Sequence, residues 1–519
     1  MPTDTAPRHR PREARGPHAW ALAWALACAS LLLPVAAPAQ PRSRPPAPPP
    51  AARAAATPAR AEGRIAARPL GADTDRAIER WLRAQMQLNH IPAVGVAVVR
   101  DGRVVLQRAL GTANLEWRTP ATVRTAFPLA SATKPLTGMA VMRLVEEGRL
   151  ALDSSVTHYL PEAPAAWRPV TVRHLLTHAS GISDDLGPNA PGDAAEATRR
   201  VAARPLTFAP GSRSSYGIGG YAVAQHLVER VTGEPFPTTL HRHVLAPLGM
   251  TRTRFDHATN DGPFRAADVV PERAGVYRLE PPGGATPSGT GAQRIAWFHF
   301  GAEAYTAGGL LSTTEDLARW ATALHGGALL GPAARRALWG DTASTGFGVG
   351  WVIGRYRGQR TVGHSGGPAL ADLLHLPDAR LTVVVLANQS RLYPYLAHGV
   401  ADLLLPAPRV AGTTATPPDT APALTARLRA VLAAAAAGTV DTLAFTPDAR
   451  REFVPAFAQF GLSYTRALGG PTAMTLVGER ADGGRTEREY RVHHGRKPVR
   501  WRFSLTPDGR IAGLAPTPE

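Results

Sequence analysis

Cysteine and lysine are almost absent from this sequence. It contains one cysteine, Cys28, and two lysines, although lysine and arginine together make up 58 of its 519 residues. Cys28 lies inside an apolar run near the N-terminus, and no thiol follows it. This excludes a disulfide framework, thiol catalysis and a cysteine-ligated metal. Because nearly every cation is an arginine, each remaining lysine is a candidate for a task that arginine cannot perform.

The sequence also lacks a basic run. Its formal net charge is +18 and its pI is near 11, but the arginines are scattered singly and no aromatic platform is interleaved with them. This pattern argues against nucleic-acid binding, whereas the positive field favours association with an anionic envelope surface.

His241 and His243 are two positions apart near a predicted helix end, and His493 and His494 are neighbours on a predicted strand. Neither pair provides a zinc set, so we expect no metal and no cofactor.

Residues 1–39 have the pattern of an export signal. Four arginines precede an apolar run from Ala19 to Leu33, and Ala37-Pro38-Ala39 offers a small-x-small cleavage site. The alternative is a transmembrane anchor, against which Pro34 and the short apolar run argue. We therefore expect an exported protein, periplasmic or extracellular.

Two proline-rich stretches divide the rest of the chain. Residues 40–70 consist mainly of proline, alanine and arginine, which predicts a disordered tether. Residues 406–422 form a Pro/Thr linker. Between them lies a domain of residues 71–405, long enough for one large core. After the linker, a helical run followed by strand-like runs predicts a small α+β accessory domain over residues 423–519.

The larger domain contains hairpin signals near both of its ends. Asp101-Gly102 separates two strand-like runs, 94–99 and 103–107, which predicts a two-residue hairpin. Runs at 370–376 and 381–388 predict a second hairpin. With helical periodicity between them, these hairpins predict an α+β fold in which one antiparallel sheet, closed by terminal strands, is covered by helices.

One of the two lysines lies three residues after a serine, as Ser131-x-x-Lys134. Apolar spacing over 136–145, ended by Gly148, predicts a helix that begins at Ser131, and Pro135 is tolerated in its first turn. Lys134 would then lie on the same face one turn later, where its amine can reach the hydroxyl. A buried lysine can lose its proton and act as a base, and a helix N-terminus leaves N–H groups near a developing oxyanion.

On Ser131-x-x-Lys134 and four further segments, the chain resembles the serine β-lactamase and penicillin-binding-protein superfamily. The resemblance is closest to the class C β-lactamase-like serine hydrolases and esterases and runs from about Asp73 to Leu405. It implies a β-lactamase/transpeptidase-like fold, in which helices and a helical subdomain flank an antiparallel sheet. The four segments are Thr125–Phe127, Leu175–Ile182, Pro247–Thr251 and Gly308–Leu317.

The resemblance also implies roles around the serine and the lysine. Tyr216 occupies the tyrosine position of the family's Tyr-x-Asn motif and would relay protons between Ser131, Lys134 and the leaving group, with Lys134 supporting its phenolate. Ile218 stands where the family has an amide that holds the lysine and the substrate. This departure disfavours β-lactams and peptides more than simple esters.

The family's third motif matches His364-Ser365-Gly366. By the same resemblance, His364 would orient the substrate or relay protons, and Gly366 would let the backbone approach the substrate. The N–H groups of Ser131 and Gly367 would form the oxyanion hole.

Two alternatives concern other polar residues. The segment from Gly363 to Gly367 also satisfies Gly-x-Ser-x-Gly, the nucleophile elbow of α/β-hydrolases. An elbow requires a helix after it, whereas Pro368 and a predicted hairpin follow here. His178 and Ser180 lie in a turn-like signature and are predicted to cap a helix.

Together these features predict an exported serine hydrolase that forms an acyl-enzyme on Ser131. Its substrate would be a small-molecule ester or amide, or a cell-wall peptide. The alternative is a degenerate family member that binds an acyl or peptidoglycan-like ligand without turnover, which Ile218 favours.

Overall fold

The structure is a computed structural model that describes most of the chain. The predicted export signal, the tether before residue 70 and most of the linker lie outside the described residues. The described residues fall into two compact units, a larger unit up to residue 406 and a C-terminal unit from residue 418. The described ranges are 70–187, 192–257, 259–261, 264–280, 292–296, 300–340, 346–367, 370–390, 396–406, 418–482, 484–495 and 497–518.

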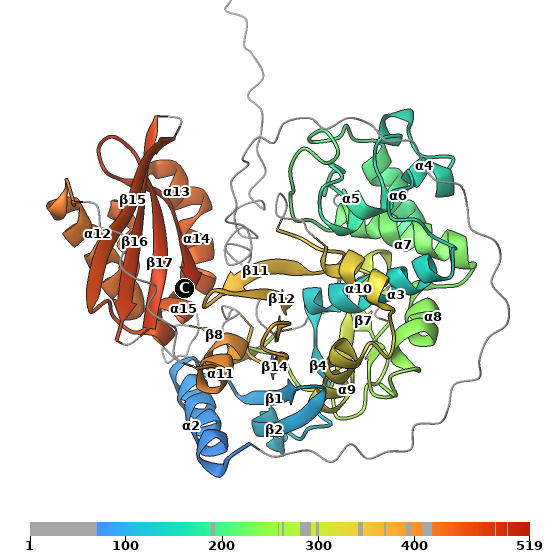
Figure 1. Cartoon of the computed structure of the whole chain (residues 1–519), viewed down its shortest axis with the longest axis horizontal. Coiled ribbons are helices and arrows are strands. Elements are labelled where there is room, and N and C mark those ends of the chain that lie inside the picture. Colours follow the sequence, from blue (N-terminus) through green and yellow to red (C-terminus); the bar gives the residue numbers. More distant parts are fainter. Residues whose placement is uncertain are drawn as a thin grey trace, which may run out of the picture. The chain divides into compact units, whose positions relative to one another are not determined.

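The larger unit is built on a seven-stranded sheet whose paired strands are all antiparallel (Figure 1). Strands from both ends of the unit meet in its middle, where Val94 is paired with Ala387. The expected sheet closed by terminal strands is therefore present. Its strands, in spatial order, are β11 (Val352–Tyr356), β12 (Gln359–Gly366), β13 (Ala371–Leu376), β14 (Leu381–Ala387), β1 (Ala93–Arg100), β2 (Arg103–Asn114) and β3 (Thr119–Pro120).

The predicted turn between β1 and β2 has the backbone that its residues favour. Asp101 and Gly102 both have positive φ, +53° and +74°. Two-residue hairpins need such angles because their twist matches that of the flanking strands. The second predicted hairpin is formed by β13 and β14, which are paired from Ala371↔Leu386 to Leu376↔Leu381.

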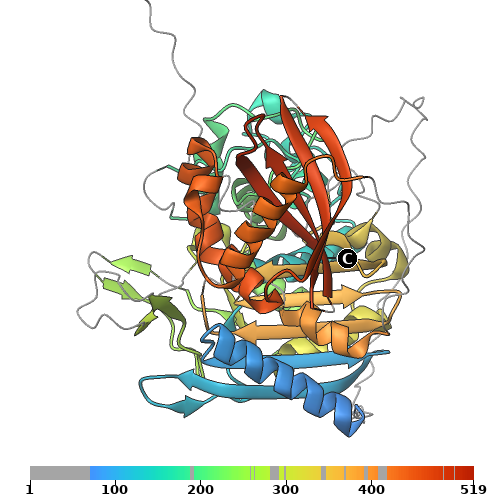
Figure 2. The same cartoon turned by 90° about the vertical axis from the view of Figure 1, so that its left-hand side faces the viewer.

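Helices cover both faces of this sheet. Every residue of β14 is buried, as is every residue of β1 except its last, which is the pattern of strands packed on two sides. α2 (Ala72–Leu88) and α11 (Leu396–Leu404) pack on one face, and α9 (Thr314–Gly326) packs on the other. In Figure 2, α2 lies in front of the strands.

A helical part of the larger unit follows β4 and carries the candidate site. In Figure 1 most of its helices gather beside α3, away from α2 and α11. None of the helices in the described ranges is long and apolar enough to cross a membrane. The helices are α3 (Lys134–Glu146), α4 (Val156–Tyr159), η2 (Ala165–Trp167), α5 (Val172–Leu176), α6 (Ala194–Ala202), α7 (Gly219–Thr232), α8 (Phe236–Leu240), the π-helix η3 (His241–Leu245), η4 (Ala302–Ala304) and α10 (Pro332–Trp339).

A three-stranded sheet holds the chain just before Ser131. In this sheet β10 lies between β4 and β5, and Leu129 N–H donates to Leu310 O at 2.8 Å. The backbone entering the Ser131 turn is therefore tied to a strand more than 170 residues away in sequence. The strands outside the large sheet are β4 (Phe127–Pro128), β5 (Arg254–Phe255), β10 (Leu310–Ser312) and two short pairs, β6 (Thr259–Asp261) with β7 (Phe264–Ala266) and β8 (Tyr277–Glu280) with β9 (Ala292–Ile295).

The C-terminal unit is a four-stranded antiparallel sheet with helices, as expected for an α+β accessory domain. Along β16 every second residue from Arg488 to His494 is buried. α12 packs on this face, where the hydroxyls of Thr425 and Tyr490 are 2.8 Å apart. Its elements are α12 (Pro422–Ala436), η5 (Thr442–Ala444), α13 (Pro447–Glu452), α14 (Val454–Ala456), η6 (Phe457–Gly461), α15 (Leu462–Leu468), β15 (Ala473–Asp482), β16 (Arg485–His494), β17 (Lys497–Leu505) and β18 (Ile511–Pro518).

Candidate active site

Ser131 lies in a tight turn that leads into α3. The helix predicted to begin at Ser131 starts as a 3-10 helix, η1 (Ala130–Thr133), and becomes α-helical at Lys134. Side chains three residues apart eclipse one another in a 3-10 helix, and Lys134 Nζ lies 3.2 Å from Ser131 Oγ. The contact expected from the spacing is therefore present. Ala130 has φ +47°, a strained conformation that surrounding structure must hold.

Lys134 is the chemical centre of the site. Its side chain is 1% exposed, and Nζ also contacts Tyr216 OH at 2.9 Å and Ala307 O at 2.8 Å. Among the described residues no carboxylate forms an ion pair with it. Burial lowers its pKa to about 7, against which the charge of Asp184 acts. Lys134 can therefore be neutral near neutral pH and accept the proton of the Ser131 hydroxyl.

Tyr216 completes a hydroxyl–amine–hydroxyl cluster. Lys134 Nζ lies between the two hydroxyls and 4.8 Å from the centre of the Tyr216 ring. Burial raises the pKa of Tyr216, although a hydrogen bond with Ser131 opposes the rise. The expected phenolate supported by Lys134 is therefore not favoured. A neutral phenol can pass a proton between neighbours, which leaves Lys134 as the group that can hold it.

His178 holds Tyr216 in place, a role that sequence reasoning missed. It does not cap a helix as predicted. Its ring packs on Tyr216 and Tyr221, with centroids 4.3 and 5.1 Å away, and its Nδ1 accepts from Gly217 N–H at 3.2 Å. Burial lowers its pKa well below the usual value, so the ring stays neutral. Ser180 likewise stays within its own turn, where its hydroxyl accepts from Ile182 N–H.

His364 lies on β12 beside this cluster but is not bonded to it. Its ring centroid is 6.1 Å from that of Tyr216. Its Nδ1 donates to Ser365 O at 2.7 Å, so Nε2 carries the lone pair, and this buried atom has no partner among the described residues. Burial lowers the pKa of His364 to about 3. The ring is thus a neutral hydrogen-bond acceptor, suited to orienting a donor and unsuited to carrying a proton near pH 7.

The end of β12 comes close to the turn that holds Ser131. A Cβ added to Gly366 would lie 1.8 Å from Leu129 O, so only glycine fits there. At Gly367 a Cβ would meet nothing within 4 Å. Gly366 thus allows strand and turn to touch. Ser131 lies in the first turn of η1, where N–H groups have no partner within the helix; its pairing with Gly367 as an oxyanion hole stays a prediction.

The nucleophile-elbow alternative does not fit this geometry. Ser365 lies within β12, paired with Asp372 of β13. A further strand follows it, and an elbow requires a helix. Ser131, in η1 directly before α3, is followed by a helix.

Ile218 departs from the family pattern, and the structure adds a residue near it that the sequence did not single out. Ile218 is the residue before α7, and its side chain makes no capping hydrogen bond. Its N–H and that of Gly219 donate instead to the carboxylate of Asp184, at 2.8 and 2.7 Å. Asp184 lies two residues after the Leu175–Ile182 segment, so only its place near a family motif could have drawn attention to it.

The described residues offer no metal site. They hold no group of three or more histidine, cysteine, aspartate or glutamate side chains suited to a metal ion.

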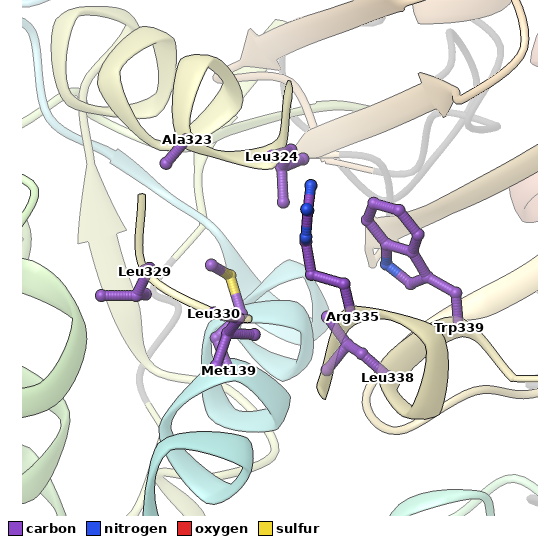
Figure 3. Close-up of a pocket in the computed structure, with 8 residues that line it drawn as sticks. All are labelled: Met139, Ala323, Leu324, Leu329, Leu330, Arg335, Leu338 and Trp339. Atoms are coloured by element: carbon purple, nitrogen blue, oxygen red, sulfur yellow. The ribbon is translucent and has the colours of Figure 1, made fainter. Parts of the chain in front are cut away.

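A small pocket lies between α3, α9 and α10 (Figure 3), but its free space of about 10 Å³ is about that of one water molecule. It is too small for a substrate. Its lining residues are Met139, Ala323, Leu324, Leu329, Leu330, Arg335, Leu338 and Trp339.

The larger unit carries a known family signature. A model of the Beta-lactamase family matches residues 78–404, well over half of the chain. The protein therefore belongs to the Beta-lactamase family. This confirms both the superfamily resemblance and the expected β-lactamase/transpeptidase-like fold.

Among curated proteins, the chain is similar to an esterase and to a staphylococcal protein. Esterase EstB of Burkholderia gladioli is 33% identical over 321 residues, which are 56% of this chain and 80% of that protein. Protein flp of Staphylococcus aureus (strain N315) is 26% identical over 257 residues, 48% of each chain. The chain thus spans most of the esterase and about half of flp.

Solved structures share the fold. A D-amino acid amidase from Ochrobactrum anthropi SV3, complexed with L-phenylalanine amide, matches with a TM-score of 0.54 and 22% identity, covering 64% of this chain and 97% of that one. The octameric penicillin-binding protein homologue from Pyrococcus abyssi matches with the same TM-score and identity, covering 85% of this chain and 95% of the other. At this identity both likenesses concern fold alone.

Proposed function

We propose that this protein is an exported serine hydrolase that forms an acyl-enzyme on Ser131, with Lys134 as the base and Tyr216 as the proton relay. The observation that carries the proposal is Lys134 Nζ, which lies within hydrogen-bonding distance of both hydroxyls and whose pKa burial lowers to about 7. A general base works best when its pKa is near the working pH. The esterase relative, EstB, supports the reaction class.

In acylation, neutral Lys134 takes the Ser131 hydroxyl proton while Oγ bonds to the substrate carbonyl carbon. The negative charge that forms on the carbonyl oxygen would be held by the N–H groups of Ser131 and Gly367. Collapse of this intermediate breaks the bond to the leaving group, which receives the proton from Lys134 through the Tyr216 hydroxyl. Water then repeats the cycle: Lys134 takes a proton from the water molecule as its oxygen bonds to the acyl carbon. The bond between that carbon and Ser131 Oγ then breaks, and Oγ takes the proton back from Lys134.

The substrate class proposed is small esters rather than amides. An amide substrate needs a partner for its own N–H and C=O, and leaving a buried group unpaired costs about 1–3 kcal/mol. The side chain of Ile218 offers no hydrogen-bond partner. Ile218 lies two residues after Tyr216 and is partly exposed. A simple ester has no N–H to satisfy. The same residue favours the second candidate function, a family member that binds an acyl or peptidoglycan-like ligand without turnover.

Labelling Ser131 with a fluorophosphonate, together with nitrophenyl ester turnover, tests the proposal. Wild-type protein should carry the label on Ser131 by mass spectrometry and release nitrophenol repeatedly. A label without repeated release would support the binding candidate. An unlabelled Ser131 in folded protein would refute the hydrolase proposal.

Export and surface association are part of the proposal and rest on sequence. The arginines and apolar run of residues 1–39 support export, and the positive net charge supports contact with an anionic envelope surface. A fusion of residues 1–60 to a reporter that is active only outside the cytoplasm should give signal. Replacing the apolar run with polar residues should remove it.

A further inference from the structure

Asp184 caps a helix that begins next to the candidate active site. Its Oδ1 accepts hydrogen bonds from the N–H groups of Ile218 and Gly219, at 2.8 and 2.7 Å. These are the first backbone groups of α7, and a helix leaves its first N–H groups without partners. Ile218 stands at the N-cap and has no polar side-chain atom. The cap therefore comes from a different segment of the chain.

The same segment presses directly on the turn that carries Tyr216. A Cβ added to Gly217 would lie 2.0 Å from Asp184 Oδ2, and one added to Gly219 would lie 2.1 Å from Ser183 O. Real Cβ atoms do not approach so closely, so the backbone carbonyl of Ser183 requires glycine at position 219, and a side chain at position 217 would displace the Asp184 carboxylate. Residues 183–184 thus fit closely against the backbone of residues 217–219, directly after Tyr216.

We propose that Asp184 is a positioning residue of this site, which takes over the part of the polar side chain missing at position 218: its carboxylate holds the Tyr216 turn and places a negative charge that acts on Lys134. This rests on the proposed function, because it concerns the same serine, lysine and tyrosine. It explains how a family member with isoleucine at position 218 can keep its lysine and tyrosine together.

The charges around Lys134 single out Asp184. Five titratable groups among the described residues face Lys134. Two are Tyr216 and Tyr221, whose ring centres lie 4.8 and 5.0 Å from its amine. The others are His178, His364 and Asp184. Burial raises the pKa of both tyrosines and lowers that of both histidines. All four are therefore neutral near pH 7, and the carboxylate of Asp184 is the remaining charge among the described residues that act on Lys134.

The carboxylate and the amine influence each other in opposite directions. Asp184 raises the pKa of Lys134 against the effect of burial. Burial raises the pKa of Asp184, while its two backbone hydrogen bonds and the charge of Lys134 oppose the rise. Asp184 also keeps contact with solvent, so it can stay ionised where a fully enclosed carboxylate would not. Removing its charge should lower the pKa of Lys134.

The test separates charge from shape with Asp184→Asn and Asp184→Ala. Asparagine keeps an oxygen that can accept from α7 but removes the charge, whereas alanine removes both. The readout is the rate at which a fluorophosphonate labels Ser131, measured from pH 5 to pH 9. The matched control is Asp185→Asn, which makes the same change of net charge at an exposed neighbour paired with Arg204 at 2.9 Å.

We expect Asp184→Asn to move the acidic limb of the labelling profile to lower pH. Well below the wild-type midpoint, its labelling rate, expressed as a fraction of its own plateau rate, should be at least about twofold higher than that of wild type. Its plateau rate should stay within about tenfold of wild type. Asp184→Ala should label Ser131 more than about tenfold more slowly than wild type at every pH. Asp185→Asn should label at the wild-type rate throughout.

The outcomes distinguish this inference from the function beneath it. If wild type labels with a midpoint that Asp184→Asn leaves unchanged, or that Asp185→Asn shifts equally, Asp184 is a helix cap only and the inference is overturned while the function stands. If folded wild type fails to label Ser131 at any pH, the proposed function fails and this inference falls with it.

Discussion

Each unit buries a cation among its described residues, Lys134 in the larger unit and Arg488 in the C-terminal unit, and the surroundings of the two differ. In the C-terminal unit Arg488 is 2% exposed and contacts two carboxylates, Asp419 at 3.2 Å and Glu479. Burial alone would lower the pKa of Arg488, but hydrogen bonds to Glu479 and Tyr490 raise it overall. In the larger unit Lys134 is 1% exposed, its contacts are two hydroxyls and a carbonyl, and its pKa falls to about 7.

This difference separates structural from functional burial of charge. A buried cation that is paired with carboxylates keeps its proton and ties elements together. A buried lysine without an ion pair is costly to keep charged, so it gives up its proton easily, which is the property of a base. The chain uses arginine for the first task and one of its two lysines for the second, in agreement with the chemistry of each side chain.

The largest expected effect follows removal of the nucleophile. Ser131→Ala should abolish hydrolysis of a nitrophenyl ester, a loss of at least about a thousandfold. Ser365→Ala should keep most of the activity, because Ser365 lies inside β12 without a helix after it. Steady-state rates on both variants decide the matter, and the reverse order of losses would revive the nucleophile-elbow alternative.

Exchange of the buried lysine for arginine comes next. Lys134→Arg keeps the positive charge but cannot accept a proton, so it should be nearly as inactive as Lys134→Ala, at roughly 100- to 10,000-fold below wild type. Ester turnover with circular dichroism as the folding control measures this. Activity within about tenfold of wild type would make Lys134 an electrostatic anchor and leave no base.

The pH profile should follow the neutral form of Lys134. Its pKa of about 7 lies below the usual lysine value because of burial, so the active form dominates above pH 7 and disappears below it. Between pH 8 and pH 5, kcat/KM should fall roughly a hundredfold, because each unit below the pKa removes about nine-tenths of the neutral amine. His364, with a pKa of about 3, stays neutral in this window. A flat profile in folded protein would contradict the assignment.

A smaller effect is expected at position 218. Ile218→Asn restores a donor and an acceptor, which should raise kcat/KM for an amide or a cephalosporin about tenfold while ester turnover changes little. Ile218→Leu is the matched control of similar size without the amide. Efficient cephalosporin hydrolysis by the wild-type protein would show that another group already supplies the hydrogen-bond donor and acceptor that Ile218 lacks.

The smallest effect on hydrolysis is expected from the other buried cation. Arg488→Lys cannot keep the contacts of the guanidinium with Glu479, Asp419 and Thr420, so the C-terminal unit should lose about 1–3 kcal/mol of unfolding free energy. The carboxylates keep solvent contact, 40% and 27% of their side chains, which limits the loss. Thermal unfolding measures it, with Ser131 labelling unchanged.

Removing the C-terminal unit altogether tests more strictly whether that unit contributes to hydrolysis. Every candidate catalytic residue precedes Leu405, so the chain can be shortened to end there. It should stay folded and accept the label on Ser131. A soluble, folded but unlabelled product would show that the C-terminal unit contributes to the site.

The sequence predicted the parts of the site that depend on local spacing. Ser131 and Lys134 meet because they lie three positions apart at a helix start. In the fold, the turn at Asp101-Gly102 likewise follows from the angles that those residues adopt. Tyr216 was placed by family resemblance. The packing of His178 on Tyr216 and the capping of α7 by Asp184 were missed, because both join residues more than 30 positions apart through tertiary contacts.

The lowered pKa of Lys134 is the central claim, and selective isotope labelling of lysine measures it directly. The chain has only two lysines, Lys134 and Lys497, so a protein labelled with ¹³C at lysine Cε gives two signals, which Lys497→Arg assigns. We predict that the Lys134 signal titrates with a midpoint near pH 7. A signal that stays in its protonated position up to about pH 10, the ordinary range of lysine, would contradict the account.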